Sequence, residues 1–210
     1  IYKLNLNFEK YFKDYDFHNL YKELLNFCTV DLSAFYFDIR KDTLYCDPKE
    51  SEKRKSTLIL LNIVLDSLLK WFAPILTFTT EEIYQLISKN KKSIHLEKFL
   101  SFPKEFENLE LNLKWEKLLK IRDACNLSIE QKRANKEIGS SLEANLTIKL
   151  SEDNQKIVEA IDLSELCITS SVRVEKSDNE DILVETTKAV GSKCPICWKI
   201  STSPCQRHTD

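Results

Sequence analysis

The 210-residue sequence lacks methionine altogether and holds only two glycines and five prolines. Such sparse glycine and proline exclude collagen-like and low-complexity classes, and no glycine-rich phosphate-binding loop is present. An apolar content of 42% and a charged content of 30% are typical of a globular chain with one or two cores. Because a natural chain starts with methionine, the start at Ile1 predicts a piece of a longer protein.

The sequence also lacks an export signal and a long hydrophobic run. Its most apolar stretch, residues 58–72, is interrupted by Asn62, Asp66 and Lys70 and is shorter than the about 20 apolar residues that a membrane span needs. Seven cysteines without an export signal indicate a reducing compartment, where clustered cysteines bind metal more often than they form disulfides. We therefore expect a cytoplasmic protein without membrane contact.

Charge is nearly balanced overall but unevenly distributed. The formal net charge of −2 gives no global signal for polyanion binding. Residues 114–137 hold seven bases against four acids, whereas residues 150–190 hold four bases against ten acids. Any bound nucleic acid is therefore expected to avoid the second region.

Helical periodicity dominates the first hundred residues. Phe17, Leu20, Leu24 and Cys28 belong to one apolar stripe spaced by three or four residues. Prolines that follow two of the apolar segments predict helix ends, and Thr79–Glu82 has the spacing of a helix-capping box. Four helices joined by short connections predict a bundle; they are expected at residues 16–28, 32–45, 52–73 and 79–88.

The remainder of the chain predicts a different organisation. A long helix is expected at residues 109–136, with Gly139 as its C-terminal cap. Apolar residues then alternate with polar ones from Leu146 to Leu150, which is typical of a strand. We predict a mainly α protein: a helical bundle at 1–108, a connecting helix at 109–138, an α+β unit at 139–190 with a helix at 155–161 and strands at 168–175 and 182–187, and a cysteine-rich knuckle at 191–210.

The strongest chemical motif lies at the C-terminus. Cys194 and Cys197 form one pair with two residues between them, and Cys205 and His208 form a second. Thiolates and imidazole suit Zn²⁺, and four protein ligands leave no open position for catalysis. The motif predicts a structural zinc site, without which so short a segment has no core of its own. The alternative is a frayed tail that carries reactive thiols.

The same knuckle combines an aromatic ring with cations. Trp198 directly follows the second cysteine, and Lys193, Lys199 and Arg207 lie close by in the sequence. An aromatic plane surrounded by cations is how proteins stack and hold an unpaired nucleotide. An equally weighted alternative is that Trp198 only packs the knuckle onto its neighbour.

Other candidate residues give weaker signals. Lys53, Arg54 and Lys55 form a basic run that either contacts RNA or simply solvates a helix end. His18 and His95 are isolated from each other and from the cysteine pairs. The sequence shows no catalytic constellation, so we predict no catalytic residue in this chain.

Several segments closely resemble bacterial isoleucyl-tRNA synthetase. Two of them, Gly139–Ala144 (GSSLEA) and Lys193–Trp198 (KCPICW), occur in the order of that family's later landmarks. The resemblance spans nearly the whole chain. In the family the second ligand pair usually consists of two cysteines after a longer loop, and an arginine often stands where Ile196 stands here. The other segments that carry the resemblance are Tyr15–Tyr21 (YDFHNLY), Asn26–Asp38 (NFCTVDLSAFYFD), Lys41–Asp47 (KDTLYCD) and Ala73–Ile83 (APILTFTTEEI).

The resemblance implies the C-terminal part of a class I aminoacyl-tRNA synthetase, with a helical anticodon-binding domain, a junction unit and a zinc-binding tail. The whole enzyme would join isoleucine to tRNA-Ile with ATP and Mg²⁺, which would be needed only in a catalytic domain whose signatures are absent here. The implied task of this part is to bind the anticodon stem and loop, and we expect a monomer. Alternatives are a zinc-stabilised module that binds another protein, or the corresponding domain of a valyl- or leucyl-tRNA synthetase.

Overall fold

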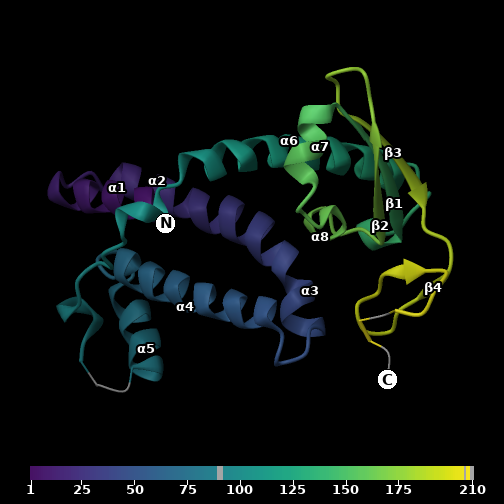
Figure 1. Ribbon diagram of the computed structural model, residues 1–210. Coiled ribbons are helices and arrows are strands. Elements are labelled where there is room, and N and C mark those ends of the chain that lie inside the picture. The colour runs from purple at the N-terminus through teal and green to yellow at the C-terminus, as the bar shows by residue number, and fades with distance from the viewer. Residues whose placement is uncertain (89–91, 206, 209–210) are drawn as a thin grey trace. The chain divides into compact units, whose positions relative to one another are not determined.

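The computed structural model describes residues 1–88, 92–205 and 207–208 and is mostly helical. The chain divides into two compact units, Ile1–Glu107 and Asn108–Asp210. The first unit is built from helices, and the second combines helices with two small sheets (Figure 1). The finer division of the chain at residues 138 and 190 stays a prediction.

The first unit contains the expected bundle and one further helix at its start. The predicted helix ends are confirmed at Asp47, which precedes Pro48, and at Ala73, which precedes Pro74. Its elements are α1 (Tyr2–Lys13), α2 (Phe17–Asn26), the π-helix η1 (Phe27–Phe37), α3 (Asp38–Cys46), α4 (Glu52–Phe72), α5 (Thr77–Ile87) and the 3₁₀ turns η2 (Ile94–Leu96) and η3 (Lys104–Phe106).

Helices α2 and α3 are joined without a break by the π-helix η1. The junction residues Asn26, Phe27 and Phe37 all keep right-handed helical dihedrals. Phe27 and Leu32 are both buried although they lie five positions apart, and five positions is the hydrogen-bond step of a π-helix. The prediction of two separate helices at 16–28 and 32–45 is therefore wrong. Between them the spacing of buried apolar residues increases to five positions, and the helix continues.

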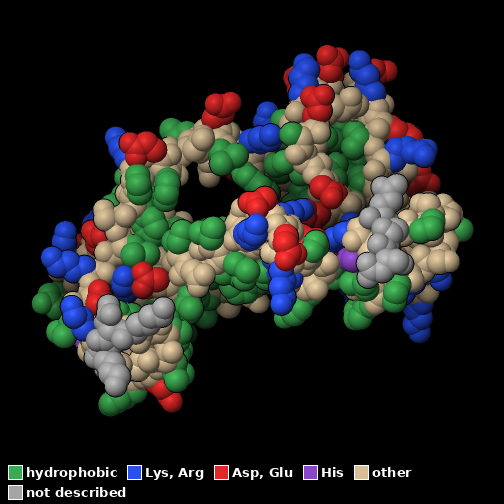
Figure 2. All heavy atoms as spheres, turned by 60° about the horizontal axis from the view of Figure 1, so that its bottom comes forward, with side chains coloured by type: hydrophobic (Ala, Val, Ile, Leu, Met, Phe, Trp, Pro, Cys, Tyr) green, Lys and Arg blue, Asp and Glu red, His purple; other side chains and the backbone are tan. Residues whose placement is uncertain are grey.

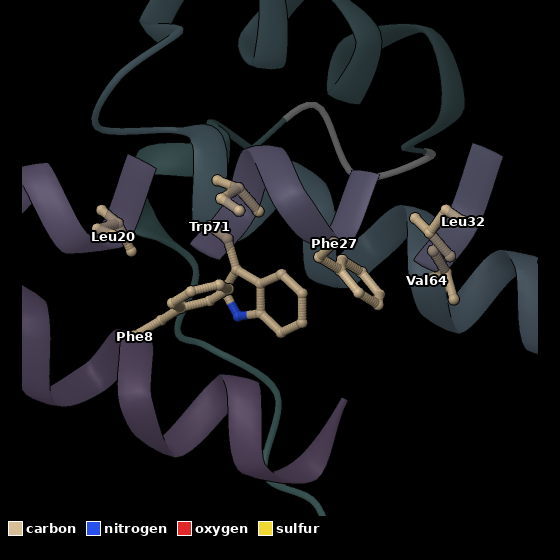
Figure 3. Close-up of a cluster of buried hydrophobic side chains, with 7 residues drawn as sticks. Phe8, Leu20, Phe27, Leu32, Val64 and Trp71 are labelled. Carbon is tan, nitrogen blue, oxygen red and sulfur yellow. The ribbon is translucent and has the colours of Figure 1, made fainter. Parts of the chain in front are cut away.

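The core of this unit is centred on Trp71 of α4. Its indole lies between the rings of Phe8 and Phe27, at centroid distances of 4.8 and 6.0 Å (Figure 3). The indole N–H donates to Asn5 Oδ1 at 2.9 Å, and Asn5 Nδ2 donates to the carbonyl oxygen of Leu100 at 2.9 Å. Buried polar groups need such partners, so the Asn5 amide links α1, α4 and the segment after η2.

The apolar stripes are less completely buried than the sequence predicts. Leu20 and Leu24 of the α2 stripe are fully buried, whereas Phe17 is 45% exposed. Helix α4 also presents apolar side chains beyond its polar stripe, among them Ile59, which is 63% exposed. Hydrophobic side chains thus reach the surface between charged ones, as Figure 2 shows. Within the described part of the chain, no helix has the combination of length and hydropathy needed to cross a bilayer.

Helix α5 begins differently from the expected capping box. Its N-cap is Leu76, which supplies no side-chain cap, and the Thr80 hydroxyl donates back to the Leu76 carbonyl oxygen at 3.0 Å. Glu81 instead accepts hydrogen bonds from Gln85 Nε2 and from the Ile94 amide, both at 2.9 Å. Glu81 therefore ties η2 to α5, and the capping-box prediction is wrong.

Glu81 gives a testable pH dependence. Hydrogen bonds from Gln85 and from the Ile94 amide lower the pKa of Glu81. The pKa of Glu81 is therefore lower in the folded than in the unfolded chain. Its stabilisation of the folded state is complete above the unfolded-state pKa and is lost as the pH falls through the folded-state pKa. We expect Glu81→Ala to lower the free energy of unfolding at pH 7, with a deficit that shrinks below about pH 4, in chemical denaturation at several pH values. Glu82→Ala, at an exposed neighbour, is the control, and a deficit independent of pH would contradict the assignment.

The second unit packs helices against a three-stranded sheet with the order β2 (Ser171–Lys176), β1 (Ala144–Leu150) and β3 (Leu183–Lys188). Strand β1 is parallel to β2 and antiparallel to β3. Helices α7 and α8 form the crossover that a parallel pair requires, and the predicted alternation is confirmed by burial of Leu146, Ile148 and Leu150. The elements are α6 (Leu109–Ala134), η4 (Ser141–Glu143), β1 (Ala144–Leu150), α7 (Glu152–Val158), α8 (Leu163–Leu166), β2 (Ser171–Lys176), β3 (Leu183–Lys188), β4 (Ser192–Lys193) and β5 (Ile200–Ser201).

Helix α6 ends before the expected glycine cap. The C-cap is Asn135, and Lys136 takes the left-handed conformation (φ 59°) that ends many helices. Gly139 instead donates its amide to Glu143 Oε2 at 3.0 Å. The prediction that Gly139 caps this helix is therefore wrong.

Candidate metal centre and nucleic-acid interface

The C-terminal knuckle, residues 191–208 apart from the undescribed 206, is held by a short antiparallel ladder. Ser192 pairs with Ser201 and Lys193 with Ile200. Gly191 precedes this ladder with φ 129°, and a Cβ added there would lie 2.1 Å from the Ser201 carbonyl oxygen. Only glycine fits so close an approach.

The four predicted metal ligands converge on one point. The ligand atoms of Cys194, Cys197, Cys205 and His208 all lie within 4.8 Å of one another. His208 Nδ1 lies 3.5 Å from Cys194 Sγ and 3.4 Å from Cys205 Sγ, and the sulfur atoms of Cys197 and Cys205 are 3.9 Å apart. The group can therefore hold one metal ion.

Three of the six separations fit the edges of a zinc tetrahedron, and the others reach at most 4.8 Å. With Zn–S bonds of about 2.3 Å and Zn–N bonds of about 2.0 Å, tetrahedral geometry gives S···S edges of about 3.8 Å and S···N edges of about 3.5 Å. The measured values of 3.9, 3.5 and 3.4 Å lie close to them. Four protein ligands fill such a site, so the ion would order the chain and leave no position for a substrate.

Local hydrogen bonds prepare one of the thiols for metal binding. The backbone amides of Cys197 and Ile196 donate to the sulfur of Cys194 and lower the pKa of this thiol to about 6. Burial acts in the opposite direction on Cys197 and raises its pKa to about 11. Since the thiolate is the form that binds metal, the lowered pKa favours the metal-binding form of Cys194.

Trp198 projects from this knuckle as a partly exposed ring. It takes the left-handed conformation with φ 65°, and its side chain is 57% exposed. Lys193 places its Nζ 5.1 Å from the centre of the indole, within the range of a cation–π contact. Trp198 and Lys193 thus lie together in the knuckle, and the exposed Arg207 directly precedes the candidate ligand His208 in the sequence.

Lys199, the third predicted cation, points back into its own unit. Its Nζ donates to Ser164 Oγ of α8 at 3.0 Å. The next residue, Ile200, donates its amide to Ser170 Oγ at 2.7 Å, and Ser170 Oγ donates to the Leu142 carbonyl oxygen at 2.5 Å. We call Ser164 and Ser170 the two-serine anchor. Sequence reasoning missed both serines because they lie 30 residues or more from their partners and belong to no spacing pattern.

The basic run of the first unit is engaged at a helix start. Arg54 Nη1 donates to the Asp47 carbonyl oxygen at 2.7 Å, and Lys55 pairs with Glu52 at 2.8 Å. Lys53 is exposed at the same end of α4. Arg54 thereby holds the turn between α3 and α4, which is the structural alternative to RNA contact for this residue.

Comparison with known proteins gives the family to which this chain belongs. Residues 1–149 match the family described as the anticodon-binding domain of tRNA ligase. This match covers the helical unit, α6 and most of β1. The chain belongs to this family.

Curated relatives that match this chain are isoleucine–tRNA ligases. The chain is similar over all 210 residues, at 62% identity, to an isoleucine–tRNA ligase of Pelagibacter ubique, of which it covers 23%. It is 39% identical over 199 residues to the isoleucine–tRNA ligase of Agrobacterium fabrum and 40% identical over 200 residues to that of Brachyspira hyodysenteriae. These matches cover 90% of this chain in both cases and 21% and 22% of the relatives.

The chain thus spans about a fifth of the length of the curated relatives it matches, and the matched region is their C-terminal part. The resemblance to isoleucyl-tRNA synthetase seen in the sequence is confirmed. Neither the protein-interaction module nor a valyl or leucyl enzyme is favoured by these relatives.

Proposed function

We propose that this chain binds the anticodon stem-loop of tRNA-Ile as part of an isoleucine–tRNA ligase. The observation that carries the proposal is the exposed indole of Trp198, held beside a metal-ligand cluster with Lys193 against the ring. Unpaired anticodon bases can stack their flat faces on such a ring, and cations around the ring can bind the phosphates of the same nucleotides. Trp198, Lys193 and Arg207 are the proposed contacts in the knuckle, with Lys53 and Lys55 as further candidates.

The proposal extends to the whole protein. It would form isoleucyl-tRNA from isoleucine, ATP and tRNA, with ATP and Mg²⁺ bound outside this chain. Zn²⁺ held by Cys194, Cys197, Cys205 and His208 would supply structural order to the knuckle. All seven cysteines are free thiols, which supports a reducing cytoplasm, and we propose a monomer.

Binding to tRNA transcripts tests this function directly. The zinc-loaded chain should bind unmodified tRNA-Ile in a filter assay and should bind more weakly when the anticodon is changed. Affinity should fall with rising salt, because phosphate contacts release counterions. Equal affinity for tRNA-Ile and an anticodon variant would contradict the proposal, and a stable complex with a protein in place of tRNA would favour the interaction module.

Trp198→Ala tests the stacking contact. If the ring stacks on a base, its removal should weaken tRNA binding by about 1–3 kcal/mol, measured by titration at fixed salt. Trp198→Phe keeps an aromatic face and should recover part of the loss. Zinc content should be equal in all three proteins. Unchanged affinity of Trp198→Ala would show instead that the indole only packs the knuckle.

A further inference from the structure

The knuckle is bound to the rest of its unit by two consecutive residues that follow Trp198. Lys199 reaches Ser164 of α8 at 3.0 Å through its side chain, and Ile200 reaches Ser170 at 2.7 Å through its backbone amide. Ser164 lies within α8, which spans Leu163–Leu166, whereas Ser170 lies between α8 and β2, which starts at Ser171. The segment after Trp198 is thus held at two separate points.

Each serine is itself fixed by a second hydrogen bond. Ser164 Oγ donates to Asp162 Oδ1 at 2.7 Å, and the same oxygen of Asp162 accepts from the Glu165 amide as the N-cap of α8. Ser170 Oγ donates to the Leu142 carbonyl oxygen at 2.5 Å. The two-serine anchor therefore connects the knuckle to α8 and to the segment that leads into β1.

The anchor acts on Trp198 because the knuckle is closed immediately around it. The Trp198 amide donates to the Cys194 carbonyl oxygen at 3.0 Å, and the Cys194 amide donates to the Lys199 carbonyl oxygen at 2.9 Å. These bonds, with a metal on Cys194 and Cys197, set the shape of the knuckle. The contacts of Lys199 and Ile200 join this closed knuckle to the α+β part of the unit.

We infer that Lys199 and the two-serine anchor are positioning residues, which hold the knuckle so that the indole of Trp198 meets an unpaired base of tRNA. The inference rests on the proposed function. It changes the role predicted for Lys199, whose ammonium group would serve an internal hydrogen bond and not a phosphate. Lys193, which lies against the indole, keeps the role of an RNA-contacting cation.

Ser164→Ala tests this inference because it removes the partner of Lys199 and leaves every charge in place. We expect its affinity for tRNA-Ile to fall roughly three- to tenfold, the effect of about one lost hydrogen bond, with unchanged zinc content. The slope of log affinity against log salt should stay as in the wild type, whereas loss of one phosphate contact lowers it by about 0.7–0.9. Ser203→Ala, in the same knuckle, is the matched control and should bind normally, because the hydrogen bonds of Ser203 within the described part of the chain go to Ser201.

Lys199→Met separates positioning from phosphate contact. A positioning lysine predicts an unchanged salt slope and no further loss when Ser164→Ala is added to Lys199→Met. A lower slope for Lys199→Met, together with normal binding by Ser164→Ala, would overturn the inference, as would normal binding by both variants.

Hydrogen exchange tests the anchor without tRNA. The Ile200 amide should exchange faster in Ser170→Ala than in the wild type and the Ser203→Ala control, because its acceptor is removed. An unchanged exchange rate would overturn the anchor itself. A wild-type chain that binds no tRNA would contradict the proposed function, and the exchange result would still decide separately whether the serines hold the knuckle.

Discussion

A Cys197→Ser variant is expected to lose stoichiometric zinc and most of its affinity for tRNA. Cys197 is buried and contributes one of the four converging ligand atoms. Structural zinc sites contribute on the order of 10 kcal/mol to the folding of small domains, far more than the two-stranded ladder of the knuckle supplies. With the metal lost, Trp198 should no longer be held in one place. The tRNA affinity should fall at least tenfold, because binding would then have to order the knuckle at a cost in conformational entropy.

Metal analysis and tRNA titration on the same preparations check this prediction. Cys46→Ser, in α3 of the first unit, is the control and should keep full zinc and tRNA binding. His208→Ala tests in the same way the ligand that stands where the resembling family usually has a cysteine. Stoichiometric zinc in Cys197→Ser would contradict the ligand set, and stoichiometric zinc in His208→Ala would exclude the histidine alone.

Trp71→Ala is expected to have the largest effect on the stability of the helical unit. The indole is fully buried and contacts Phe8 and Phe27. Truncation of such a side chain costs about 3–5 kcal/mol through lost burial and the remaining cavity. The Asn5 Oδ1 atom would also lose its donor, which adds about 1–3 kcal/mol for an unsatisfied buried acceptor.

Chemical denaturation followed by circular dichroism measures this loss. Trp71→Phe keeps a ring between Phe8 and Phe27 but removes the hydrogen bond to Asn5, so it should cost about 1–3 kcal/mol and separate the two contributions. Tyr45→Ala, at a side chain that is 83% exposed, is the control for loss of an aromatic residue. A loss below about 1 kcal/mol for Trp71→Ala would contradict the central place of the indole.

The sequence predicts the helices and the ligand cluster well because both depend on short spacings. The apolar period of α6 runs from Leu111 to Ile129 and locates the buried residues Leu118, Ile121, Cys125 and Ile129, whereas Leu111 itself is 49% exposed. Two residues between paired ligands suffice to bring four donors together. Features that depend on distant partners were not predictable. The role of Glu81 is set by Ile94, which belongs to a turn after the end of α5. The engagement of Lys199 depends on a serine 35 residues earlier.

Because the π-helix η1 connects α2 and α3 without a break, the orientation of α3 depends on the number of residues in η1 as well as on their type. A residue removed from a helix rotates everything beyond it about the helix axis, by about 100° in an α-helix. A rotation of this order in η1 would change how the buried residues Ile39 and Thr43 of α3 are oriented relative to Leu20 and Leu24 of α2. A one-residue deletion at an exposed position between Phe27 and Phe37 would therefore rotate the buried face of α3 away from its present partners, although it removes no buried side chain. For this stretch of the chain, alignment gaps between relatives should be far rarer than substitutions.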